Sequence, residues 1–163
     1  MTVPPRPTCL CVPVALQRYV SPPPVAQRQL ALAMMIAKAE GARVRVVSVE
    51  AKLPLVPQAE GLREKLQDFV RPLFDAKIDV DFDILTGRPG DVVPQYFVNK
   101  GCDLLVLGSH SKRGVLEAGL GNVATSLSKD VTAPIVLVRP SLAEIEATKA
   151  LMIPEMPWML PYF

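Results

Sequence analysis

Five short apolar runs, separated by longer stretches with apolar residues at helical spacing, constrain the fold of this chain most strongly. Short runs of this kind are typical of strands buried on both faces of a parallel sheet, and the longer stretches supply the crossover helices between them. The predicted strands are Thr8–Ala15, Ala42–Val49, the segment of Val80, Phe82 and Ile84, Asp103–Gly108 and Ala133–Arg139. The predicted helices are Val25–Glu40 with Gly41 as C-cap, Gln58–Ala76, Asp91–Lys100 and Leu120–Asp130. The sequence therefore predicts an α/β fold, a five-stranded parallel sheet with helices on both faces.

The apolar runs also predict where individual strands lie in that sheet. The first and fourth runs are the most continuous, so we expect both strands near the centre. The fifth run is bounded by Pro134 and Pro140, which favours an edge position. The third run alternates with Asp79, Asp81 and Asp83, which indicates a solvated face on an edge strand.

Proline clusters divide the chain into three parts. We predict a proline-rich leader over residues 1–7, one α/β domain over 8–140, and a C-terminal helix and tail over 141–163. Ser141 and Glu144 have the spacing of a capping box, which predicts the start of that helix. The tail 154–163 is rich in proline and aromatic residues and holds the single tryptophan, Trp158. We expect it to be covered, either by its own domain or dimer mate, or by a groove of another protein.

Composition excludes several classes of protein. Eighteen Lys and Arg stand against 16 Asp and Glu, a net charge of +2, which is too balanced for a dedicated nucleic-acid binder. The longest apolar stretch, Leu30–Ala37, is too short to cross a membrane. Three cysteines and no signal-peptide pattern predict the reducing cytoplasm, where Cys9, Cys11 and Cys102 serve as small buried side chains and hold no metal.

The stretch from Gly108 to Asn122 is a loop of small and basic residues between the fourth strand and a helix N-terminus. Free backbone N–H groups and the helix dipole favour an anion there, so the loop predicts phosphate binding. Neither the dinucleotide-binding spacing nor the P-loop spacing of glycines occurs in it.

This loop resembles the motif of the universal stress protein family, which runs Gly, two residues, Gly, nine residues, Gly and Ser or Thr. Gly108 matches the first glycine and Gly121 the third, and the resemblance extends over Thr8–Arg139. It implies the adenine nucleotide alpha hydrolase-like fold, a homodimer through strand 133–139, and ATP or another adenine nucleotide as ligand. The implied binding residues are Gly108, Ser109, His110, Ser111, Gly121, Asn122 and Val123.

Three positions depart from the family's pattern. Ser111 replaces the second glycine, Asn122 the terminal Ser or Thr, and Ala15 the acidic residue that follows the first strand. Because alanine cannot hydrogen-bond a nucleoside, we predict weak or no ATP binding. The segment Leu16–Pro24 is longer than the family's short link, and it either fills the pocket mouth or supplies Arg18 or Tyr19 as a substitute contact.

The sequence predicts that the protein is not an enzyme. His110 is the only histidine, and no nucleophile with a base and an orienting group surrounds it. Two functions remain as alternatives: a nucleotide-binding regulatory protein of the stress response, or a ligand-free interaction module that acts through its tail.

Overall fold

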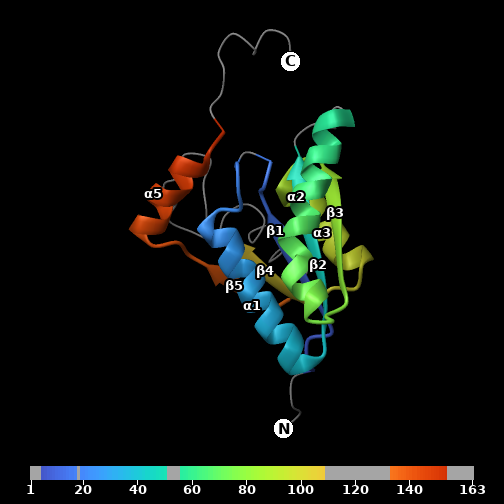
Figure 1. Ribbon diagram of the computed structural model, residues 1–163. Coiled ribbons are helices and arrows are strands. Elements are labelled where there is room, and N and C mark those ends of the chain that lie inside the picture. Colours follow the sequence, from blue (N-terminus) through green and yellow to red (C-terminus); the bar gives the residue numbers. More distant parts are fainter. Residues whose placement is uncertain (1–4, 18, 51–55, 109–132, 154–163) are drawn as a thin grey trace.

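The computed structural model describes residues 5–17, 19–50, 56–108 and 133–153, with only the backbone of 56–59. Within these residues, the strands form one parallel sheet in the order β3-β2-β1-β4-β5 (Figure 1). The strands are β1 (Cys9–Val14), β2 (Arg43–Glu50), β3 (Val80–Thr86), β4 (Leu104–Gly108) and β5 (Ile135–Val138). The helices are α1 (Pro24–Glu40), α2 (Val56–Asp75), α3 (Pro89–Asn99) and α5 (Leu142–Leu151). The predicted fold class is confirmed. The predicted helix Leu120–Asp130 lies outside the described residues.

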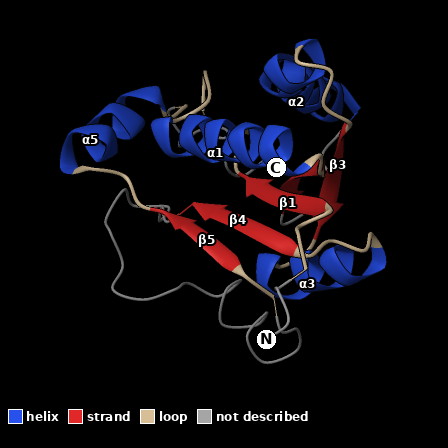
Figure 2. Cartoon of the chain, turned by 90° about the horizontal axis from the view of Figure 1, so that it is seen from below, coloured by secondary structure: helices blue, strands red, loops and turns tan. Residues whose placement is uncertain are grey.

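Helices cover both faces of the sheet. Figure 2 shows α1 and α2 on one face and α3 on the other. Residues of β1 alternate between the two cores: Leu10, Val12 and Val14 pack with α1 and α2, whereas Cys9 and Cys11 pack with α3. All five are buried, which explains the unbroken apolar run in the sequence.

The predicted strand order is confirmed in the described sheet. β1 lies at its centre with β4 beside it, and β3 and β5 form the edges. The acidic residues of β3 form side-chain contacts that the prediction of a solvated face did not include. Asp81 pairs with Arg45, and Asp83 accepts a hydrogen bond of 2.7 Å from the hydroxyl of Tyr96.

Helix α3 differs from its predicted form. It begins at Pro89, two residues before the predicted start at Asp91, because proline is preorganised for the first position of a helix. Pro94 therefore lies beyond the first turn, where it cannot donate the usual hydrogen bond to the preceding turn. The C-cap of α1 is confirmed, since Gly41 has a φ of 67°, the left-handed conformation that favours glycine.

The start of β1 is tied to the start of β4 by Asp103. Its carboxylate accepts hydrogen bonds from Thr8 N at 2.9 Å, from Thr8 Oγ1 at 2.8 Å and from Cys9 N at 3.1 Å. Asp103 N in turn donates to Cys9 O at 2.9 Å. These contacts hold the two central strands together at their amino ends.

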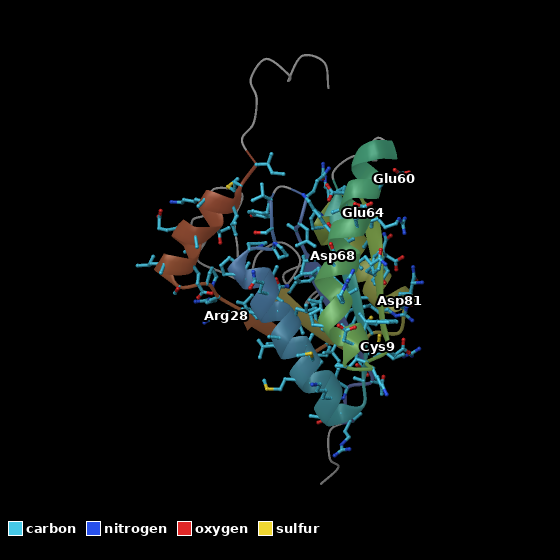
Figure 3. All side chains as sticks on the ribbon, in the orientation of Figure 1. Cys9, Arg28, Glu60, Glu64, Asp68 and Asp81 are labelled. Atoms are coloured by element: carbon cyan, nitrogen blue, oxygen red, sulfur yellow. The ribbon has the colours of Figure 1, made fainter. Side chains whose placement is uncertain are left out.

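The predicted capping box opens α5. Glu144 N donates to Ser141 Oγ at 3.2 Å, and Ser141 N donates to Glu144 Oε1 at 3.1 Å. The helix packs beside α1, where Arg28 Nε lies 3.4 Å from Glu144 Oε2 (Figure 3). The tail 154–163 lies outside the described residues.

Acidic residues line the outer face of α2. Glu60, Glu64 and Asp68 follow one another at intervals of one helical turn (Figure 3). Across the described ranges, no helix combines the length and the apolar character that crossing a bilayer requires.

Candidate functional site

The order of the strands reverses between β1 and β4, so their carboxyl ends are the place where an open α/β sheet offers a crevice. The ladder between them is short. Its paired residues are Leu10 with Leu104 and Cys11 with Leu105, although β1 continues to Val14 and β4 to Gly108.

Pro13 explains why the ladder stops. Leu105 N donates to Pro134 O, directly before β5, so the carbonyl of the next residue, Val106, points toward β1. In the continued register the N–H of residue 13 would be its donor, and proline has none. A side chain from α1 supplies that donor instead. Gln29 Nε2 donates to Val106 O at 3.1 Å and to Pro13 O at 2.7 Å.

Gln29 also explains the glycine at the end of β4. The side chain of Gln29 is fully buried, and its Oε1 has no hydrogen-bond partner among the described residues. A Cβ on Gly108 would lie 2.9 Å from Gln29 Cδ and 2.9 Å from Val25 Cγ2, which is closer than real contacts allow. Glycine is therefore required here by packing against α1.

A polar group lies at the carboxyl end of β2, beside the end of β1. Ser48 pairs with Val14 in the sheet and is fully buried, and its Oγ donates to Glu50 Oε1 at 3.3 Å. The carboxylate of Glu50 thus lies at the carboxyl end of β2, two residues beyond the residue that pairs with Val14 of β1.

Sequence reasoning missed Gln29, Ser48 and Glu50. Gln29 has helical spacing with Ala26, Ala33 and Ala37, which are all buried. This spacing could have predicted that Gln29 is buried and hydrogen-bonded. Ser48 and Glu50 interrupt the apolar run of β2 at its carboxyl end, but only the register of the sheet brings them to the end of β1.

The segment Leu16–Pro24 packs against two helices. Leu16 and Tyr19 are buried, Val20 N donates to Leu151 O at 2.9 Å, and Lys65 Nζ donates to Tyr19 O at 3.0 Å. Tyr19 also forms an antiparallel bridge with Met152, after α5. The segment is thus anchored to α2 and α5, and Arg18 lies outside the described residues.

Of the predicted binding residues, Gly108 is described, at the carboxyl end of β4. Ser109, His110, Ser111, Gly121, Asn122 and Val123 lie outside the described residues. Ala15 is half-buried directly after β1. Among the residues that the structure describes, no group of three or more His, Cys, Asp or Glu is placed to hold a metal ion.

Comparisons with known proteins point to one family. The model of the family described as "Universal stress protein family" matches residues 19–139. A universal stress protein of Methanocaldococcus jannaschii is 26% identical over 80 residues, which are 49% of this chain and 49% of that protein. The match thus spans about half the length of that curated relative.

Three solved structures share the architecture at low identity. The structure of the Methanocaldococcus protein has a TM-score of 0.66 at 19% identity, over 82% of this chain and 96% of that one. A universal stress protein from Archaeoglobus fulgidus in complex with dAMP has a TM-score of 0.60 at 18% identity, over 80% and 97%. A family protein from Arabidopsis thaliana with AMP bound has a TM-score of 0.58 at 18% identity, over 85% and 95%.

Proposed function

Because the chain belongs to the universal stress protein family, we propose that it is a non-catalytic regulatory protein that binds an adenine nucleotide weakly. The proposed site lies at the carboxyl ends of β1, β2 and β4. Two relatives of the same fold carry dAMP and AMP, which supports this class of ligand.

The observation that carries the proposal is the polar group beside the parted strands. A carboxylate at the end of a neighbouring strand is the group with which many α/β proteins accept hydrogen bonds from a nucleoside hydroxyl. Glu50 ends the neighbouring strand β2, and Ser48 Oγ donates to its carboxylate and so orients it. In this proposal Glu50 substitutes for the acid missing at Ala15, and Gly108 opens the loop that receives the phosphates.

Calorimetric titration with AMP and ATP tests the proposal. We expect a dissociation constant weaker than about 1 μM, because Glu50 on the neighbouring strand is the one replacement for the family's acid. Glu50→Ala should weaken AMP binding by about tenfold, the equivalent of one lost hydrogen bond to a charged group.

Glu60→Ala is the matched control, because Glu60 is an exposed glutamate on the outer face of α2. It should leave the affinity unchanged. If neither nucleotide binds at millimolar concentration, the proposed function is wrong. If Glu50→Ala binds AMP as the wild type does, the nucleoside site is elsewhere.

We further propose that the protein is a homodimer through strand 133–139. In the described sheet β5 is an edge strand, with β4 as its neighbour, and an unpaired edge is a template for a second strand. Light scattering at micromolar concentration should give twice the 17.7 kDa of one chain. A particle of 17.7 kDa would contradict the dimer.

A further inference from the structure

Three cysteines gather on the α3 side of the sheet, at the end opposite the nucleotide site. Cys9 and Cys11 share one face of β1, and Cys102 lies between α3 and β4. All three are buried free thiols, and the sulfurs of Cys9 and Cys102 are 3.4 Å apart. The sequence prediction that the three thiols are buried is confirmed. The fold also brings the sulfurs of Cys9 and Cys102, 93 residues apart in the chain, within hydrogen-bond distance.

The backbone around this pair is compatible with a covalent link. The Cys9 carbonyl accepts from Asp103 N at 2.9 Å, so the two segments are hydrogen-bonded neighbours. Neighbouring strands lie about 4.8 Å apart, within the Cα separations that disulfides span. The sulfurs need to approach by about 1.4 Å to reach the disulfide bond length, a distance within reach of side-chain rotation.

We propose that Cys9 and Cys102 are a redox modification site that forms an intramolecular disulfide with a peroxide as the oxidant. In the first step the Cys102 sulfur attacks one oxygen of hydrogen peroxide, which yields a sulfenic acid and one water. In the second step the Cys9 sulfur attacks the Cys102 sulfur and displaces the hydroxyl group as a second water. The two thiols lose two electrons and two protons, and the peroxide is reduced to two waters.

The order of the steps follows from exposure. Cys102 is 8% exposed and Cys9 is fully buried, so the peroxide meets Cys102 first. Contact with Cys11 and burial raise the pKa of Cys102 to about 12, and contact with Cys102 raises the pKa of Cys9 further. Both groups therefore rest as thiols, and the reaction is slower than that of an exposed cysteine.

Arg45 assists the second step. Its guanidinium lies near Cys9 and opposes the rise in the pKa of that thiol. Arg45 Nε is buried and has no hydrogen-bond partner among the described residues. The guanidinium also pairs with Asp81 through Nη1. Its positive charge favours the Cys9 thiolate as it forms, and the thiolate is the nucleophile in disulfide formation.

Peptide mapping of the full chain tests the proposal. The protein is treated with hydrogen peroxide, its remaining thiols are alkylated after unfolding, and the digest is analysed by mass spectrometry without reduction. We expect one cross-linked pair of peptides, about 2 Da lighter than the sum of the reduced peptides, and its loss after dithiothreitol. No cross-linked pair in the wild-type protein would overturn the proposal.

Cys9 and Cys11 are separated only by Leu10 and stay on one peptide, so a variant must tell them apart. Cys11→Ala should keep the cross-link, and Cys9→Ala should abolish it. A cross-link that survives in Cys9→Ala assigns the disulfide to Cys11 and overturns the proposed pair.

The rate of cross-linking tests the role of Arg45. Arg45→Met should slow disulfide formation severalfold, whereas Arg45→Lys, which keeps the positive charge, should stay closer to the wild-type rate. Equal rates in all three proteins would contradict this role of Arg45. Nucleotide binding is independent of each of these outcomes, because Cys9 and Cys102 lie at the amino ends of the strands.

Discussion

Gln29 Nε2 donates a hydrogen bond to the carbonyl oxygen of Pro13 across 2.7 Å, and this contact joins helix α1 to the central strand. The same nitrogen reaches Val106 O on β4. The Gln29 amide thus replaces the backbone N–H that Pro13 lacks. The two strands therefore stay connected through Gln29 at the point where their ladder ends.

Removing the Gln29 amide should destabilise the protein. Gln29→Leu keeps a similar volume but leaves the Pro13 and Val106 carbonyls without their donor, at a cost of about 1–3 kcal/mol. Urea unfolding measures the change. Gln27→Leu is the control on the same helix, because its amide is exposed and donates to Pro22 O, and it should change stability by less than about 0.5 kcal/mol. Equal effects of the two substitutions would contradict the role of Gln29.

A side chain at residue 108 should be harmful even without a ligand. Gly108→Ala forces a methyl group against Gln29 and Val25, and overpacking of this kind costs about 1–3 kcal/mol. Gly61→Ala is the matched control, since a Cβ there meets nothing within 4 Å and a helix gains up to about 1 kcal/mol from the exchange. Thermal unfolding should therefore move in opposite directions for the two variants. If the Gly108→Ala protein were as stable as the wild type, α1 would have to shift and accommodate the added methyl group without cost.

The capping box should make stability depend on pH. Hydrogen bonds from Ser141, with a contribution from Arg28, lower the pKa of Glu144 below its ordinary value of 4.5. Because the folded pKa is the lower one, the charged carboxylate stabilises the fold above pH 4.5, and this contribution is lost as the pH falls through the folded pKa. The melting temperatures of the wild type and Glu144→Gln should differ at neutral pH and converge in acid. A constant difference from neutral to acidic pH would argue against this source of stability.

The fluorescence of Trp158 should report how the tail is covered. The chain has no other tryptophan, so the emission belongs to this residue, which lies outside the described part of the structure. We expect a blue-shifted emission that is protected from soluble quenchers, because an apolar aromatic segment favours burial on its own domain or dimer mate. Red-shifted and freely quenched emission would favour the alternative, a tail that binds another protein.

The sequence was most informative where one local signal decides the structure. The unbroken run at Thr8–Ala15 predicted a doubly buried strand, and Ser141 with Glu144 predicted a helix start to the residue. It was least informative where a contact joins distant segments. Gln29 is 77 residues from Val106, and Cys9 is 93 residues from Cys102, and neither pairing follows from spacing along the chain. The place of Glu50 likewise depends on the register between β1 and β2.

The tie between Asp103 and Thr8 has a practical consequence for how binding can be measured. It fastens the chain at the amino ends of β1 and β4, the end of the sheet opposite the proposed site. The chain therefore enters β1 from the end of the sheet away from the carboxyl ends of the strands, and a force applied ahead of Thr8 would load the contacts of Asp103 first. A sensor surface that captures the protein by this end leaves the carboxyl ends of the strands facing the solution, so under the proposed function immobilised and free protein should give the same affinity for AMP.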